Sequence, residues 1–114
     1  MINKRAVGTQ KELIASDFLR ENNVEILEMN FRCKSGEIDI IGMDNDYLVF
    51  YEVKFRSNIS YGYPEEAVNT RKQHKIYQAS QYFMLINNYI DNTPIRYDVI
   101  SILGNQIKHI RNAF

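Results

Sequence analysis

The sequence has 114 residues, of which 45% are hydrophobic and 25% are charged, and its 14 Lys and Arg balance its 14 Asp and Glu. These values predict one soluble globular domain over residues 1–114 and exclude a disordered chain. They also exclude the strongly basic overall charge of many nucleic-acid binders, so a phosphate-binding surface would have to be local.

Cysteine content and hydropathy narrow the expected environment. Cys33 is the single cysteine, so an internal disulfide framework is excluded. Residues 1–10 contain no apolar signal region, and no stretch approaches the roughly 18 consecutive apolar residues of a membrane-spanning helix. We therefore expect a cytoplasmic protein with no membrane contact.

The first half of the chain predicts one helix followed by three strands. Apolar residues fall on a helical stripe over residues 10–22, which ends at two asparagines. Extended runs follow at residues 24–33, 36–44 and 47–56. Because the connections between these runs are short and polar, the runs are expected to form antiparallel hairpins.

The second half predicts another helix and two more strands. Pro64, followed by two glutamates, is typical of the first turn of a helix, and this helix should be long. Its buried face is expected to contain Ala67, Val68, Ile76, Ala79, Phe83 and Ile86. Its opposite side is basic and polar. Residues 95–103 and 106–114 are expected to be strands separated by a Gly-Asn turn.

The element order αβββαββ predicts an α/β sandwich in which helices flank a mixed central sheet. Within that sheet the run LVFYEVKF is apolar on both faces, as a central strand requires. Glu52 and Lys54 break this pattern and, being two residues apart, project to the same face. Burying two charges costs several kcal/mol each unless it is compensated, so a functional site explains them better than a core does.

The preceding strand supplies further carboxylates through its run GEIDII. Strict alternation places Glu37 and Asp39 on one face of that strand, and Ile38 and Ile40 on the other. If this strand forms a hairpin with the next one, Asp39 approaches Glu52. The two strands therefore predict a pair of carboxylates beside a lysine.

Such a group of residues suits a divalent cation. Asp39, Glu52 and the backbone carbonyl of Val53, together with water, form an oxygen-rich set of ligands that favours Mg²⁺ or Mn²⁺. The cation would neutralise a phosphodiester while Lys54 stabilises developing charge. Glu12, on the first helix, adds a carboxylate if that helix packs over the site. We therefore predict a metal-dependent nuclease that hydrolyses phosphodiester bonds.

Several basic residues could contact nucleic-acid phosphates. Arg71, Lys72 and Lys75 belong to the second helix, and Arg56 ends the third strand. An ordinary solvated surface is the competing interpretation for all four. An alternative function also remains open, namely a non-catalytic module that keeps the fold and binds nucleic acid or a protein. The expected substrate is DNA, and action on RNA is a third possibility that the metal site does not exclude, because RNA presents phosphodiesters as DNA does.

A set of longer motifs points to a known family. The runs GEIDII, LVFYEVKFR, EEAVNTRKQHKI, RYDVISI and IKHIRNAF together resemble the YraN-like family of small bacterial proteins. That family is similar to Holliday-junction resolvases in the PD-(D/E)XK nuclease superfamily. The resemblance covers the chain from about Gly8 to Phe114. One departure is Lys11, where the family commonly has a glycine before the helix glutamate.

The resemblance implies a restriction-endonuclease-like fold and a set of residue roles. Asp39 would be the motif aspartate, Glu52 and Lys54 the ExK pair, and Glu12 the helix carboxylate, with Glu37 assisting. It also implies DNA as the substrate, branched DNA among the forms, and a homodimer.

The resemblance gives Asp98 a structural part. This residue matches the family's Arg-aromatic-Asp pattern within RYDVISI, which implies a hydrogen-bonding or ion-pair role. Arg96 and Arg32 are the expected partners.

Overall fold

The structure is a computed structural model that describes residues 4–114, so residues 1–3 of the N-terminal segment lie outside it. Its elements are α1 (Lys4–Glu21), β1 (Glu25–Cys33), β2 (Gly36–Asp44), β3 (Tyr47–Arg56), the 3-10 helix η1 (Pro64–Ala67), α2 (Thr70–Ile86), β4 (Ile95–Leu103) and β5 (Gln106–Ile110). The predicted order αβββαββ is confirmed, with η1 as an additional element. No helix in the described part of the chain is both long and apolar enough to cross a membrane.

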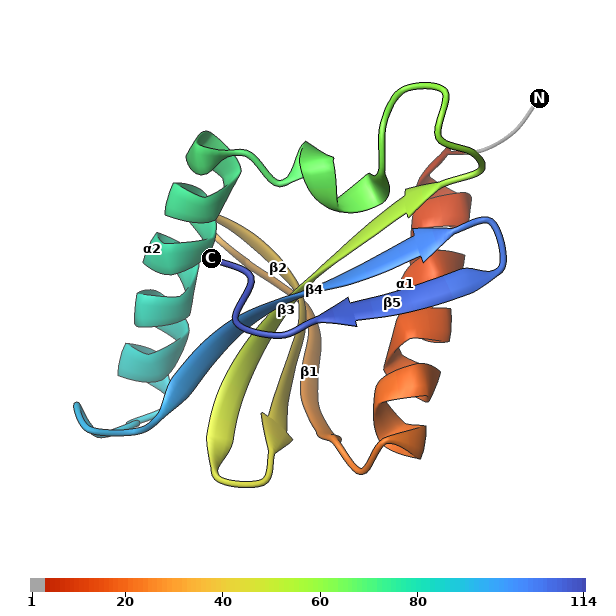
Figure 1. Cartoon of the computed structure of the whole chain (residues 1–114). Coiled ribbons are helices and arrows are strands. Elements are labelled where there is room, and N and C mark those ends of the chain that lie inside the picture. The colour runs from red at the N-terminus through yellow and green to blue at the C-terminus, as the bar shows by residue number, and fades with distance from the viewer. Residues whose placement is uncertain (1–3) are drawn as a thin grey trace.

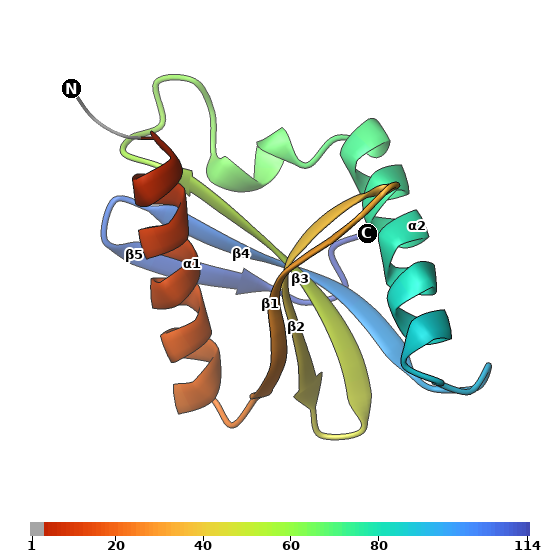
Figure 2. The same cartoon turned by 180° about the vertical axis from the view of Figure 1, so that it is seen from behind.

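The five strands form one sheet in the order β1-β2-β3-β4-β5. Strands β3 and β4 pair in parallel, and the other neighbours pair antiparallel, so the predicted mixed sheet and both hairpins are confirmed. Figures 1 and 2 show α1 and α2 on opposite sides of this twisted sheet. The architecture is compatible with a restriction-endonuclease-like fold.

Each face of the sheet has its own hydrophobic core. The core under α1 contains Ala15, Leu19, Val24, Ile40, Val49, Tyr51, Ile100 and Ile102. The core under α2 contains Phe31, Ile38, Ile41, Leu48, Phe50, Ile76, Ala79 and Phe83. Full burial of one large apolar side chain contributes roughly 1.5–3 kcal/mol, and β3 supplies such side chains to both cores. This double burial explains its continuous apolar run.

Both helices differ from the prediction at their first turns. Helix α1 begins at Lys4 and not near residue 10, because the apolar stripe marks only the part that packs on the sheet. Pro64 begins the separate helix η1, so the prediction that it starts the long second helix is wrong. Helix α2 begins only at Thr70, after Asn69, whose Oδ1 accepts a hydrogen bond from the Lys72 N–H at 2.9 Å.

The predictions for the last residue of α2 and for the end of β5 are also wrong. Ile86 is 49% exposed, because it is the last residue of α2, and does not belong to the buried face. Strand β5 ends at Ile110 and does not reach Phe114. The chain turns at Asn112, which has a φ of 53°, and the Asn112 N–H donates to Asp98 Oδ1 at 2.9 Å.

Strands β1 and β2 do not alternate regularly along their whole length. Ile38 packs in the core under α2 whereas Ile40 packs in the core under α1, so the prediction that they share a face is wrong. The neighbours of Asn30 on β1 divide between the two cores in the same way. Asn30 has a φ of 55°, a left-handed conformation that asparagine tolerates better than most residues. The irregularity falls at Asp39, between the two isoleucines.

Asp98 is fully buried at the centre of a polar network. Arg96 Nε donates to its carboxylate at 2.9 Å, and His109 Nε2 lies 2.7 Å from Asp98 Oδ2. The Asn112 N–H completes the set, and Arg96 also donates to Asp44 Oδ2 at 2.7 Å. Burial alone would raise the pKa of Asp98, but these hydrogen bonds outweigh it and lower that pKa. The expected structural role with Arg96 is confirmed.

Candidate metal and catalytic site

The separation of β2 from β3 creates the candidate site. The last pair of their ladder is Ile40 with Tyr51, so Asp39 and Glu52 occupy the positions of the next pair. The strands diverge there, and Asp39 Oδ2 accepts a hydrogen bond from the Val53 N–H at 2.8 Å. A side-chain carboxylate thereby satisfies a backbone donor of the central strand. The expected approach of Asp39 to this part of β3 is confirmed.

Glu52 is the most buried acidic group of the site, with 3% of its surface exposed. Its Oε1 lies 3.6 Å from Lys54 Nζ and 3.4 Å from Lys72 Nζ. Within residues 4–114, the buried Oε2 has no hydrogen-bond partner. The predicted proximity of Glu52 and Lys54 is confirmed. An unpartnered buried oxygen is costly, and a ligand that supplies positive charge would satisfy it.

The electrostatics of the site favour an added cation. Burial raises the pKa of Glu52, and the nearby Asp39 carboxylate raises it further, to about 7, despite the opposing effect of Lys72 and Lys54. Burial also raises the pKa of Asp39, although the Val53 N–H and Lys72 oppose this. Two neighbouring carboxylates whose pKa values are both raised are typical of functional sites. A bound divalent cation would favour the ionised form of both.

A second group of carboxylates adjoins Asp39. One oxygen each from Glu12, Glu37 and Asp39 lies within 4.8 Å of the others. Burial raises the pKa of Glu12, and Asp39 adds to the effect. The first half of α1, which carries Glu12, and the start of β2 lie at the same end of the molecule (Figure 2). The structure therefore brings the helix carboxylate to the strand carboxylates.

A cavity of about 330 Å³ opens beside this acidic group. It is lined by Gly8, Thr9, Glu12, Asn30, Arg32 and Glu37. Within this lining, Arg32 Nε lies 3.6 Å from Glu37 Oε1 across the β1–β2 ladder. Arg32 is therefore not the partner of Asp98, which pairs with Arg96. Space for a small polar ligand thus exists next to the carboxylates.

The donor set fits a hard divalent cation. The groups gathered here are carboxylates, and Mg²⁺ and Mn²⁺ prefer oxygen ligands. Asp39 is common to both acidic groups, and Glu52 contributes the unpartnered oxygen. Val53 engages Asp39 through its N–H, while a role for its carbonyl as a metal ligand stays a prediction.

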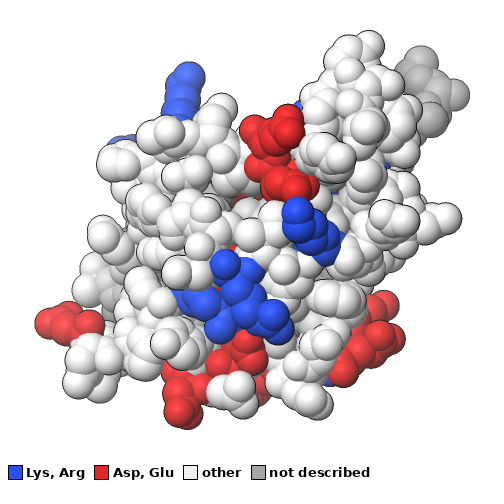
Figure 3. All heavy atoms as spheres, viewed as in Figure 1, with Lys and Arg blue, Asp and Glu red and all other residues white. Residues whose placement is uncertain are grey.

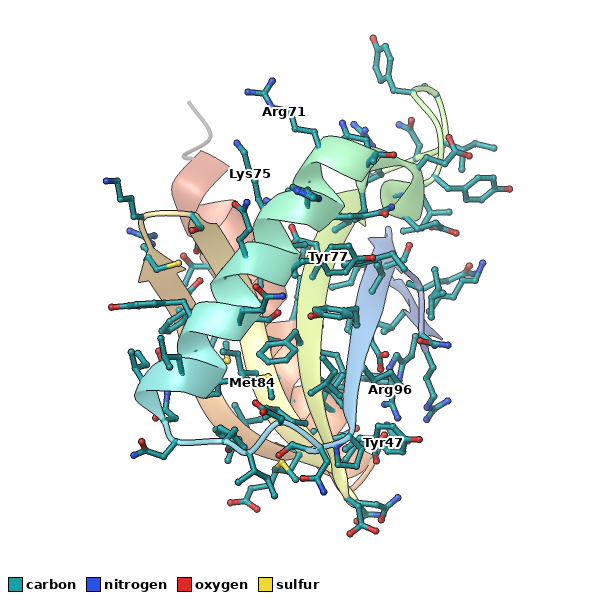
Figure 4. The ribbon with its side chains drawn as sticks, turned by 90° about the vertical axis from the view of Figure 1, so that its left-hand side faces the viewer. Tyr47, Arg71, Lys75, Tyr77, Met84 and Arg96 are labelled. Atoms are coloured by element: carbon teal, nitrogen blue, oxygen red, sulfur yellow. The ribbon has the colours of Figure 1, made fainter. Side chains whose placement is uncertain are left out.

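The structure separates the predicted basic residues. Lys72 lies against Glu52, whereas Arg71 and Lys75 extend from the first turns of α2 into solvent (Figure 4). Arg56 is the last residue of β3, and its carbonyl accepts a hydrogen bond from the Gly104 N–H at 2.8 Å. Of the four residues predicted to contact phosphates, Lys72 is the one that forms an ion pair with a site carboxylate among residues 4–114.

Charge is mixed on the molecular surface. In the view of Figure 3, acidic atoms gather over η1, which carries two glutamates, and basic atoms lie beside them. No single sign of charge covers this face. The balance of charges in the sequence is therefore repeated on the side that Figure 3 shows, and any phosphate contact there would be local.

Sequence reasoning missed the parts played by Asn30 and Arg32. The Asn30 side chain hydrogen-bonds to Glu12, and its left-handed backbone marks the point where the strands change face. An asparagine between the apolar Met29 and Phe31 was a usable signal, since asparagine tolerates such conformations better than most residues. The Arg32–Glu37 ion pair depends on the register of the β1–β2 hairpin, and that register was not determined from the sequence.

Known proteins resemble the chain over nearly its whole length. The model of a family described as uncharacterised protein family UPF0102 matches residues 11–102, which include every predicted site residue. A UPF0102 protein of Lachnoclostridium phytofermentans is 44% identical over 113 residues, which cover 99% of this chain and 96% of the relative. One from Acetivibrio thermocellus is 47% identical over 122 residues, covering 98% and 93%. One from Clostridioides difficile is 45% identical over 115 residues, covering 99% and 100%.

Proposed function

The chain belongs to the uncharacterised protein family UPF0102, and we propose that it is a metal-dependent nuclease that hydrolyses DNA phosphodiester bonds. One observation carries the proposal. Where β2 leaves β3, two neighbouring carboxylates, those of the partly buried Asp39 and the buried Glu52, meet two lysines, and one buried oxygen of Glu52 has no hydrogen-bond partner among residues 4–114. Stability alone does not explain this arrangement, because buried charges are costly to desolvate.

The proposed ligands are Asp39 and Glu52, with the Val53 carbonyl as a third donor and Mg²⁺ or Mn²⁺ as the cation. When bound, the cation supplies Lewis-acid stabilisation of the charge on the phosphodiester. Glu12 and Glu37 each place a carboxylate oxygen within 4.8 Å of Asp39 and add negative charge there, which strengthens the attraction for a cation.

The protein groups have separate tasks in hydrolysis. Lys54 is held on β3 next to Glu52, where its ammonium can position the attacking water and stabilise negative charge as it develops on the phosphoryl oxygens. The water loses one proton to solvent as its oxygen forms a bond to phosphorus and one P–O ester bond breaks, and the departing oxygen takes up a proton from solvent. The proposed contacts to phosphates of the bound DNA strand are Arg56, Arg71, Lys72 and Lys75. Branched DNA as the preferred form and a homodimer belong to the same proposal.

Cleavage assays test this function. Purified protein is incubated with labelled duplex, single-stranded, flapped and four-way-junction DNA, and with matched RNA, in Mg²⁺, in Mn²⁺ and in EDTA. We expect cleavage of DNA with either cation and none in EDTA, because the buried carboxylates need the cation to act on a phosphodiester. Cleavage of RNA alone would change the substrate class. DNA binding without cleavage under any condition would contradict the nuclease and favour the non-catalytic module.

A further inference from the structure

The side chain of Lys72 brings a positive charge to the candidate site. We propose that Lys72 is the internal counterion of the metal-free site, whose ammonium neutralises Glu52 and withdraws toward solvent when a divalent cation binds. The inference rests on the proposed function for the existence of that cation. It goes further by giving one residue of α2 a defined part in metal loading.

Lys72 and Lys54 together neutralise the Asp39–Glu52 pair of the metal-free site. Lys72 Nζ lies 3.4 Å from Glu52 Oε1, slightly closer than Lys54 Nζ at 3.6 Å. Asp39 and Glu52 together carry two negative charges when ionised, and the two ammonium groups carry two positive ones. A divalent cation bound to Glu52 would face both ammonium groups at short range, where like charges repel. One ammonium must therefore leave, or the cation binds weakly.

The structure indicates which of the two lysines moves. Lys54 belongs to a strand that is paired on β4, where it is registered with Ser101, and 28% of its side chain is exposed. Lys72 reaches the site from the first turn of α2, and 36% of its side chain is exposed. Rotation of its side chain toward solvent requires no change in the sheet.

The position of Lys72 within α2 is not explained by helix stability. It is the third residue after Asn69, the N-cap, and the first turn of α2 contains no acidic residue. A positive charge at this end opposes the helix dipole, which favours anions there. Attraction to Glu52 offsets this unfavourable placement. Arg71 occupies the same turn but extends into solvent, so it provides a matched comparison (Figure 4).

Calorimetric titration of the full chain with Mn²⁺ tests the role of Lys72. We expect Lys72→Met to bind Mn²⁺ roughly five- to tenfold more tightly than wild type, because no ammonium has to be displaced and repulsion is removed. Arg71→Met, which removes one positive charge from the same helical turn, should bind Mn²⁺ within about twofold of wild type, because its charge lies toward solvent and is screened. Lys72→Arg keeps the positive charge, so its affinity for Mn²⁺ should be closer to that of wild type than the affinity of Lys72→Met is.

Stability measurements give a second readout that needs no activity. In EDTA, Lys72→Met should unfold at a lower temperature than wild type, because Glu52 loses one of its two cationic partners. Saturating Mn²⁺ should raise the melting temperature of this variant by more than it raises that of wild type. Should Lys72→Met fail to fold, Lys72→Gln provides the same comparison with a polar end at this partly exposed position.

The possible results separate this inference from the proposed function. Unchanged or weaker Mn²⁺ binding by Lys72→Met would overturn the counterion role, whatever the nuclease assays give. Tighter binding in a protein that cleaves no nucleic acid would uphold the counterion role and contradict the nuclease. Absence of Mn²⁺ binding in wild type and in the variant would overturn both.

Discussion

Asp39→Asn should lower the rate of metal-dependent DNA cleavage by about 10³-fold, a loss of the size seen when a group that stabilises transition-state charge is removed. The amide oxygen of asparagine can still accept the hydrogen bond that the Val53 N–H donates, so the fold should be kept. The negative charge shared by the two acidic groups is lost, and with it the proposed hold on the cation. Single-turnover cleavage of the best DNA substrate in Mn²⁺ measures the effect.

Asp46→Asn is the matched control for this experiment. It makes the same chemical change in the exposed turn at the other end of the same β2–β3 hairpin, away from the site. We expect it to cleave at the wild-type rate. Equal cleavage by wild type, Asp39→Asn and Asp46→Asn would show that the activity does not depend on the candidate site.

Asp98→Ala should destabilise the protein by about 3–5 kcal/mol, because removal of one partner from a buried charged network leaves the others uncompensated. Arg96, His109 and the Asn112 N–H would lose their shared acceptor in a fully buried position. A loss of this size corresponds to a fall of roughly 10–25 °C in melting temperature for a chain of this length. Chemical denaturation and thermal scans at neutral pH measure it.

The control for Asp98→Ala is Asp44→Ala, which removes the other carboxylate that Arg96 contacts. Asp44 retains 16% side-chain exposure, and Arg96 keeps Asp98 in this variant, so the expected loss is about 1 kcal/mol. Equal stability losses in the two variants would contradict a central role for Asp98.

The contribution of Asp98 to the free energy of unfolding should decrease as the pH is lowered into the acid range. Its pKa is lowered in the folded protein, where hydrogen bonds from His109, Arg96 and the Asn112 N–H more than offset its burial. A group with a lowered folded pKa stabilises the fold at pH values above its unfolded pKa, about 3.9, and this contribution is lost as the pH falls through the folded pKa. The stability difference between wild type and Asp98→Ala should therefore be full at neutral pH and shrink below about pH 4.

The sequence predicted the strands well because their signals are local. The bounds of residues 36–44, 47–56 and 95–103 agree with β2, β3 and β4, since each run is apolar and ends at turn-forming or polar residues. Because Glu52 and Lys54 are two residues apart on one strand, the sequence also predicted that they share a face, where they form an ion pair. Local alternation was sufficient for these features.

Other features depend on contacts between distant segments, and the sequence alone did not provide them. Strand β1 changes face at Asn30, which has a left-handed backbone, and β2 changes face between Ile38 and Ile40; strict alternation anticipates neither change. The meeting of Glu12 with Asp39 requires α1 to pack over the start of β2. Likewise, the contact of Lys72 with Glu52 depends on where α2 begins, and η1 shifts that start to Thr70. Tertiary packing decides such points.

The proposed function depends on a divalent cation bound at Asp39 and Glu52. Crystals grown with saturating Mn²⁺ and measured for anomalous scattering locate that ion directly. We expect a single strong peak within coordination distance of both carboxylates, with Lys72 Nζ moved away from Glu52. A peak confined to Glu12 and Glu37, or no peak anywhere near Asp39 at saturating Mn²⁺, would contradict a metal-dependent nuclease site at the end of the β2–β3 ladder.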